Sequence, residues 1–202
     1  MFGEVFLVAL AAGMSPGPDF FVVMRNSLGF GLKVGLATAM GIALALTVHV
    51  AYTIAGFAVV LAHYPSAFTA IRLLGAGYLV FLGVQALRSQ SNGSAIEFST
   101  ERGTKTFGGG LRDGFLCNLL NPKAPLFFLA VFAQFLAATT ASWAQWLCGL
   151  EAVLVIGGWF VALSFIIDRR WFRTFYVRRS TWIDRSFGAL LLACAARIVA
   201  DL

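Results

Sequence analysis

The chain has 202 residues, of which 59% are hydrophobic and only 12% are charged, and its mean hydropathy is +0.84. Soluble domains carry roughly 25% charged residues, so this composition excludes a soluble globular domain and indicates an integral membrane protein. Fifteen Lys and Arg residues against nine Asp and Glu give a net charge of +6, and the positions of those charges decide what it means.

Apolar residues occur in blocks of about 20, the length at which an α-helix crosses hydrocarbon. We therefore predict one all-α polytopic membrane domain, 1–202, with transmembrane spans at residues 4–26, 34–61, 67–87, 111–137, 143–167 and 183–200. At about 1.5 Å per residue, the second block is longer than a hydrocarbon core about 30 Å thick. We expect that span to tilt, or to bend at Gly41 or Gly56.

The basic residues gather in the first, third and fifth connections between these spans, and the second and fourth connections contain none. This distribution marks loops and does not form a nucleic-acid surface, so no nucleic-acid partner is expected. The positive-inside bias places the odd connections in the cytoplasm and both termini outside. Six arginines lie in or beside the fifth connection, which acts either as a topology signal alone or also as a contact for anionic lipid headgroups.

The N-terminal apolar stretch lacks the basic region of a signal peptide, so we expect an uncleaved first span. Cys117, Cys148 and Cys194 all lie inside predicted spans, without a CxxC motif or a nearby histidine. Such cysteines are typical of packing residues, and we expect neither a metal site nor a cofactor.

Two proline-bearing stretches interrupt the first and fourth spans, "SPGPDFF" at 15–21 and "LNPKAPLFF" at 120–128. Proline has no N–H to donate, and its ring clashes with the carbonyl four residues earlier, so Pro122 is expected to free the carbonyl of Asn118. In hydrocarbon an unsatisfied carbonyl costs several kcal/mol, and breaks in both spans therefore imply a polar interior. The predicted helix-break residues are Pro16, Gly17, Pro18, Pro122 and Pro125.

A polar stretch, 88–110, divides the chain into two halves of three spans each, 1–87 and 111–202. Aligning Pro18 with Pro122 also aligns Asp19 with Lys123. Because three is an odd number, the second half enters the membrane from the opposite side, which predicts a 3+3 inverted-topology repeat of the kind found in secondary transporters. The alternative is a chance similarity, since proline is tolerated in membrane helices generally.

Asp19 and Lys123 place charge beside the two breaks. A charge at the centre of a membrane helix costs about 2.5–3.5 kcal/mol, so each residue should face the interior and have a partner. One account is structural: the two residues form a salt bridge, or Asp19 reaches water near Arg25. The other is functional: Asp19 meets a cationic group or a transported proton, while Lys123, with Asn121, meets an anionic group.

Three weaker candidates for coupling or packing lie elsewhere. His49 is either hydrogen-bonded inside the bundle or part of a proton relay. Glu151 lies deep enough in its span to need a partner, and serves either helix pairing or coupling. Arg72 lies near the start of the third span and is able to snorkel to the outer surface.

At these motifs the sequence resembles the LysE-type translocators, in particular the homoserine/threonine exporter (RhtB) branch. The combination of "PGPD" at 16–19 with "NPK" at 121–123 is specific, although either alone is weak. The resemblance runs from about residue 15 to 135, and "IDRSFGALLLACAARI" at 183–198 fits the last span more weakly. The family pattern falls on Pro16, Gly17, Pro18, Asp19, Gly41, Arg72, Gly75, Asn121, Pro122, Lys123, Gln134 and Phe135.

The resemblance implies a proton-driven, six-span exporter of amino acids or their derivatives, homoserine-, threonine- or lysine-like, in the bacterial cytoplasmic membrane. Two departures leave the substrate open. The family often has proline before Gln134, where this chain has alanine, and relatives tend to carry glycine in place of Ala193 or Cys194.

Two rival functions remain at this point. A passive channel or scaffold would use the prolines only to shape a bundle, with Asp19 and Lys123 paired permanently. A membrane-embedded enzyme is not expected, because no spacing offers a nucleophile with a base and an orienting group. The expected partners are a small-molecule substrate, protons and membrane lipids, with homo-oligomerisation left open.

Overall fold

The computed structural model of the chain describes residues 2–63, 65–88, 104–121, 123–135, 140–167 and 169, and, towards the C-terminus, residues 179, 181–182, 185–186, 188–193, 195–196 and 200. Throughout this part the regular structure is helical, with no strand. Pro122 lies outside the described residues, as do the side chains of Arg72 and Gln134. The predicted linker 88–110 and the predicted sixth span 183–200 are described only in part.

Seven helices are defined: α1 (Phe2–Met14), α2 (Pro18–Phe30), α3 (Leu32–His63), α4 (Pro65–Arg88), α5 (Phe107–Leu119), α6 (Lys123–Phe135) and α7 (Ser142–Ile166). By length and composition, α3 and α7 are each able to cross a membrane. The α1–α2 and α5–α6 pairs also qualify if each counts as one broken span, and they bend by 58° and 59°. The described residues thus carry two to four candidate spans, with breaks at both proline-bearing stretches.

The local sequence explains where each broken span restarts. Gly17 is the extended N-cap of α2, its carbonyl accepts from the Phe21 N–H, and Pro18 occupies the first helical position, which favours proline. In the second pair, the Asn121 side-chain oxygen accepts from the Lys123 N–H at 3.0 Å. Pro125 lies inside the first turn of α6, where a missing N–H leaves no helical bond unmade, so it does not form the break itself.

The connection expected between the first two spans, residues 27–33, is reduced to a single residue. Helix α2 ends at Phe30, Gly31 adopts φ +89°, and α3 begins at Leu32. Only glycine takes this left-handed conformation without steric cost. The helix α3 then runs for 32 residues, and neither Gly41 nor Gly56 interrupts it.

Helix α3 packs against α2, α5, α6 and α7, so it forms the centre of the bundle. Its crossing with α5 depends on glycines. A Cβ added to Gly114 would lie 2.0 Å from the Thr38 carbonyl oxygen, and one added to Gly41 would lie 2.1 Å from that of Leu111. Small residues of this kind let the backbones of membrane helices approach closely. Because α5 belongs to the second half of the sequence, this contact joins the two halves.

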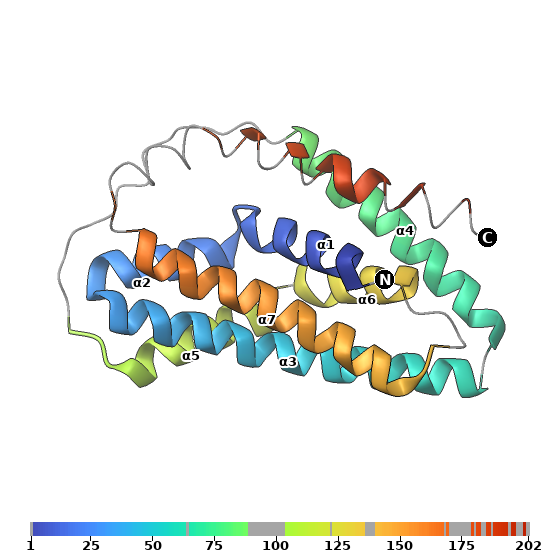
Figure 1. Cartoon of the computed structure of the whole chain (residues 1–202), viewed down its shortest axis with the longest axis horizontal. Helices are drawn as coiled ribbons and strands as arrows, with labels where there is room; N and C mark the ends of the chain where they lie inside the picture. Colours follow the sequence, from blue (N-terminus) through green and yellow to red (C-terminus); the bar gives the residue numbers. More distant parts are fainter. Residues whose placement is uncertain are drawn as a thin grey trace.

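Figure 1 shows α3, α5 and α7 along the long axis of the molecule, with α1 and α2 beside them and α4 along the upper right edge. Helix α1 packs on α7, and α4 packs on α6. The C-terminal residues approach α4 through another glycine contact, since a Cβ on Gly188 would lie 2.6 Å from the Gly83 carbonyl oxygen. The first half therefore contacts the second at several places.

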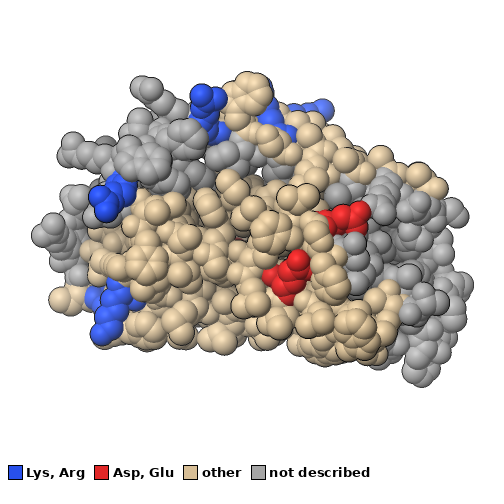
Figure 2. Space-filling model, viewed as in Figure 1, with Lys and Arg blue, Asp and Glu red and all other residues tan. Residues whose placement is uncertain are grey.

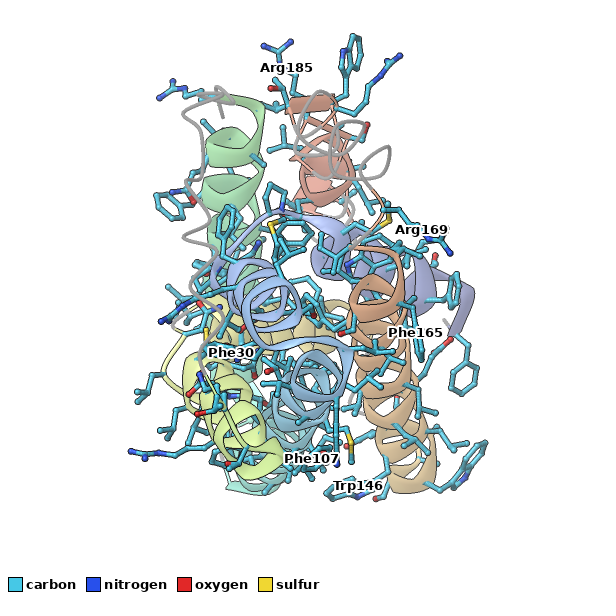
Figure 3. The ribbon with its side chains drawn as sticks, turned by 90° about the vertical axis from the view of Figure 1, so that its left-hand side faces the viewer. Phe30, Phe107, Trp146, Phe165, Arg169 and Arg185 are labelled. Carbon is cyan, nitrogen blue, oxygen red and sulfur yellow. The ribbon has the colours of Figure 1, made fainter. Side chains whose placement is uncertain are left out.

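The outer surface of the bundle is apolar. On α3 an exposed stripe with a spacing of four residues contains Met40, Leu44, Val48 and Tyr52. On α7, Trp146 and Phe165 point away from the bundle in Figure 3. On the face seen in Figure 2, Lys and Arg lie at the left end and along the upper edge, and acidic side chains lie to the right of the centre within an otherwise uncharged area. Such a surface suits lipid and indicates a multi-pass membrane protein.

Candidate functional site

The two helix breaks meet at one small cavity. Its volume is about 50 Å³, and its polar lining combines five side chains from both halves of the chain, which we call the break site: Ser15, Asp19, Asn118, Asn121 and Lys123. The remaining wall is largely apolar, with Leu46, Phe127, Phe128, Ile156 and Phe160. A cavity needs roughly 10–15 Å³ to hold one water molecule, so this one has room for a few waters and is too small for an amino acid.

Asp19 is the second residue of α2 and is held by amides from the opposite half. Its Oδ2 accepts from Asn118 Nδ2 at 2.9 Å and from Asn121 Nδ2 at 3.4 Å. The thiol of Cys117, a weak donor, also lies near this carboxylate. The N-terminus of α2 favours the negative charge further.

Lys123 begins α6, and its Nζ donates to Ser15 Oγ at 3.4 Å. Asp19 and Lys123 thus line the same cavity, with the two asparagines donating to the carboxylate. A cation at a helix N-terminus lies against an unfavourable dipole. An anion placed beside Lys123 would therefore be stabilised by both the ammonium and the helix end.

A second, larger cavity lies on the other side of the first break. It has a volume of about 860 Å³ and shares Ser15, Gly17, Pro18 and Lys123 with the small one. Its opposite wall is the C-terminal part of α4, from Phe81 to Arg88. The two cavities are therefore separated by the first break and by Lys123.

His49, on α3, contacts the second break at the end of α5. Its ring is 2% exposed and stacks on Phe128, its Nε2 lies 3.2 Å from the Asn118 carbonyl oxygen, and its Nδ1 lies 2.6 Å from the Tyr52 hydroxyl. A carbonyl oxygen only accepts, so in the neutral ring Nε2 carries the proton and Nδ1 accepts from Tyr52. The carbonyl that Pro122 was expected to free therefore has a side-chain donor from α3.

Glu151 lies on α7 and lines neither cavity. The roles expected for Arg72 and Gln134 depend on side chains that lie outside the described residues. Among the described residues, no group of three His, Cys, Asp or Glu side chains is placed to hold a metal ion.

The Asn118 side chain was not predicted as part of a site, although its carbonyl was expected to be freed by Pro122. The signal was present, since an amide inside an apolar span requires partners just as a charge does. Cys117 was predicted to be a packing residue, and its thiol lies near Asp19.

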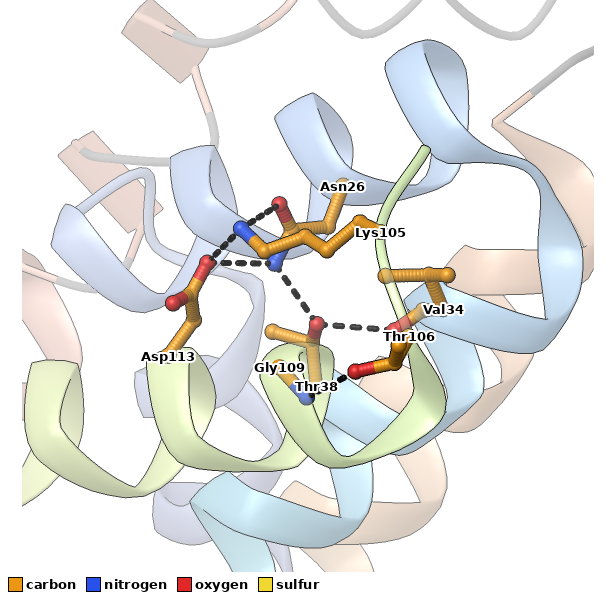
Figure 4. Close-up of polar contacts among 7 residues, drawn as sticks. All are labelled: Asn26, Val34, Thr38, Lys105, Thr106, Gly109 and Asp113. Atoms are coloured by element: carbon orange, nitrogen blue, oxygen red, sulfur yellow. Dashed lines mark hydrogen bonds and ion pairs between the residues drawn. The ribbon is translucent and has the colours of Figure 1, made fainter. Parts of the chain in front are cut away.

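A second polar cluster was not predicted from the sequence. We call it the Asn26 cluster, and it consists of Asn26, Thr38, Lys105 and Asp113 (Figure 4). Asn26 Nδ2 donates to Thr38 Oγ1 at 2.8 Å and to Asp113 Oδ2 at 3.1 Å, and its Oδ1 accepts from Lys105 at 3.3 Å. Lys105 also pairs directly with Asp113, and Thr38 donates to the Val34 carbonyl. The cluster joins α2, α3 and α5 at one end of the bundle.

Known proteins resemble this chain over nearly its whole length. The threonine efflux protein of Escherichia coli K12 is 28% identical over 202 residues, covering 98% of this chain and 97% of that protein. The leucine efflux protein of Salmonella choleraesuis is 32% identical over 202 residues, covering 97% and 91%. An uncharacterized membrane protein of Vibrio cholerae is 29% identical over 197 residues, covering 93% and 91%. No solved structure matches significantly.

The family comparison gives the same result as the motifs. A model of the LysE type translocators matches residues 10–202, which include both proline-bearing stretches and every residue of the break site. The chain belongs to the LysE type translocator family, and with it to the amino-acid efflux proteins.

Proposed function

We propose that this protein exports neutral amino acids from the bacterial cytoplasm in exchange for protons, with the break site as the substrate site. The observation that supports this most directly is the small cavity, where one carboxylate and one ammonium from opposite halves lie beside paired helix breaks. Half-helix N-termini near the membrane midplane are where secondary transporters hold anionic substrate groups.

The charges of the site match those of a free amino acid. Asp19 would bind the substrate ammonium, and would take up the proton when the substrate leaves. Lys123 and the N-terminus of α6 would bind the carboxylate, with Asn121 shaping the turn between them. Each role uses a group that is already oriented by hydrogen bonds.

The substrate class follows from what the two cavities contain. Asp19 is the single carboxylate among the described lining residues, which leaves no second anion for a lysine or arginine side chain. Apolar and aromatic side chains form most of the remaining wall. Both features favour threonine-, homoserine- or leucine-like substrates over lysine-like ones, in agreement with the names of the threonine and leucine efflux relatives.

Transport requires the cavity to open, because about 50 Å³ does not admit an amino acid. The larger cavity provides a route, since it reaches Lys123 and ends at Arg88, beside a connection that the positive-inside bias places in the cytoplasm. We assign it to the path by which substrate arrives. Movement of the breaks would then expose the site to the other side, with both termini outside.

An inverted repeat of three spans per half, 1–87 and 111–202, would supply this motion. In support, the two broken pairs bend by similar angles, and each packs on the long helix of the other half, α1 on α7 and α5 on α3. This exchange of partners is what a two-fold axis in the membrane plane would produce.

The decisive experiment is transport in reconstituted liposomes. We expect labelled threonine, homoserine or leucine to accumulate inside the liposomes when the lumen is more acidic than the medium, because protons that leave would drive substrate in. A protonophore removes the proton gradient and should stop this accumulation. Labelled lysine is the matched negative substrate.

Each contrary result identifies a different error. A passive channel would equilibrate substrate down its own gradient with or without the protonophore. Transport of lysine at the same rate as threonine would refute the neutral substrate class. If no amino acid moves in any condition, the proposed exporter function is wrong.

A further inference from the structure

The break site contains two buried acceptor atoms without a matching donor. Asp19 Oδ1 and Asn118 Oδ1 are both shielded from solvent, and neither has a hydrogen-bond partner among the described residues. Buried polar atoms are normally paired, so each such atom requires an explanation. Three further buried polar atoms without a partner among the described residues belong to Ser27, Glu151 and Trp159, which do not line the cavity.

The chemistry of the site fixes which atom of Asn118 remains unpaired. A carboxylate only accepts hydrogen bonds, so Asn118 must present its Nδ2 to Asp19, as the 2.9 Å contact shows. The amide oxygen is then necessarily the atom left over. Asn118 is 1% exposed, and it lines the cavity together with Asp19.

Asn118 is also held firmly from the other side. Its backbone carbonyl lies 3.2 Å from His49 Nε2, and the Asn121 N–H donates to the same oxygen at 3.0 Å. These contacts fix the end of α5, and the bond to Asp19 fixes the side chain. The unpaired oxygen is therefore a preorganised acceptor, and His49 is a positioning residue for it.

We infer that Asp19 Oδ1 and Asn118 Oδ1 together form the binding site for a primary ammonium group, with Asn118 as a substrate ligand that discriminates amino acids from their uncharged analogues. This inference rests on the proposed function and specifies the contacts of its substrate. A primary ammonium has three N–H donors and therefore serves both oxygens at once. A hydroxyl has one donor and no charge, so it leaves an acceptor buried and unpaired.

The experiment compares L-leucine with its α-hydroxy analogue, 2-hydroxy-4-methylpentanoate, as inhibitors of labelled leucine transport in liposomes. The quantity measured is the ratio of their half-inhibitory concentrations, which does not depend on how much protein is active. For the unchanged protein we expect leucine to be preferred by at least about tenfold, since hydrogen bonds to charged groups contribute about ten- to hundredfold each.

Asn118→Leu removes the amide oxygen at similar volume. We expect it to reduce the preference for leucine about tenfold, because leucine would inhibit more weakly while inhibition by the hydroxy acid would be nearly unchanged. The matched control is Asn26→Leu, which removes another fully buried asparagine, 0% exposed, from the Asn26 cluster. That control should leave the ratio as it is in the unchanged protein.

The result that would overturn the inference is an unchanged ratio in Asn118→Leu, or an equal loss for both inhibitors, which would make Asn118 a structural residue only. If Asn118→Leu is inactive, direct binding of both compounds to purified Asn118→Ser supplies the same ratio. Because the unchanged protein must transport leucine for any ratio to be measured, failure of the proposed exporter function appears separately, as no transport at all.

Discussion

The bundle contains two polar clusters of similar make-up, and they differ in how completely their hydrogen bonds are matched. In the Asn26 cluster, Lys105 and Asp113 pair with each other and with both ends of the Asn26 amide. In the break site, one carboxylate and one ammonium line the same cavity, yet Asp19 and Asn118 each keep a buried acceptor unpaired within the described part of the chain.

This difference separates a structural role from a functional one. A completely matched network holds helices together and has nothing further to bind. A network with unpaired acceptors beside a cavity is less stable than it would be if matched, and it gains a partner when a ligand enters. Four substitutions test whether the two clusters really divide the work in this way.

The largest effect is expected at the helix crossing beneath the Asn26 cluster. Gly114→Ala would place a methyl group 2.0 Å from the Thr38 carbonyl oxygen, and because neither backbone is able to yield, we expect a loss of about 3 kcal/mol in stability. The measurement is the amount of monodisperse protein extracted from membranes. The control is Gly108→Ala on the same helix, where an added Cβ meets no atom within 4 Å. Equal yields from the two variants would contradict the close α3–α5 packing.

Asp19→Asn should abolish transport without removing the protein from the membrane. The amide has neither the charge to hold an ammonium nor a proton to exchange, and loss of one partner of a buried charge pair reduces function about a hundredfold or more. Asp113→Asn is the matched control, since it neutralises the carboxylate of the Asn26 cluster and should leave the transport rate per folded protein within about threefold. Normal transport by Asp19→Asn would remove Asp19 from the mechanism.

His49→Leu should lower transport about tenfold, which corresponds to one lost hydrogen bond of about 1.4 kcal/mol. The variant removes the donor to the Asn118 carbonyl but leaves every cavity-lining residue in place. His49→Gln keeps a side-chain N–H that is able to reach this carbonyl, so it should recover most of the rate. If His49→Leu and His49→Gln transport at the same rate, His49 does not act through its N–H donor.

Thr106→Ala should have the smallest effect. Thr106 caps α5 by accepting from the Gly109 N–H at 3.1 Å, and loss of such a cap costs about 1 kcal/mol. We expect a small decrease in the melting temperature in detergent and an unchanged transport rate. Thr106→Ser preserves the hydroxyl and should have the same melting temperature as the unchanged protein. A large loss of transport would mean that the end of the bundle with the Asn26 cluster takes part in the transport cycle.

The elements predicted best are those that local chemistry decides. The breaks at 15–21 and 120–128 follow from proline, which has no N–H to donate and whose ring clashes with the preceding turn. The first connection was predicted less well. Residues 27–33 looked like a loop, but Gly31 alone makes the corner, because one left-handed glycine suffices to reverse the chain.

The break site was predicted in outline but not in detail. Asp19, Asn121 and Lys123 stand out as polar residues beside prolines, and all three line the small cavity. Asn118 did not stand out, because its importance comes from facing Asp19, 99 residues away in the sequence. The sequence does not show which residue an asparagine in an apolar helix will face.

Membrane residence and the places where two spans break are therefore determined by the sequence alone, through hydrophobic length and the covalent structure of proline. The pairing of side chains was decided only by the tertiary structure. His49 meets the Asn118 carbonyl across 69 residues, and Asn26 meets Asp113 across 87. Such contacts depend on how closely helices pack, and here the glycines of α3 and α5 set that distance.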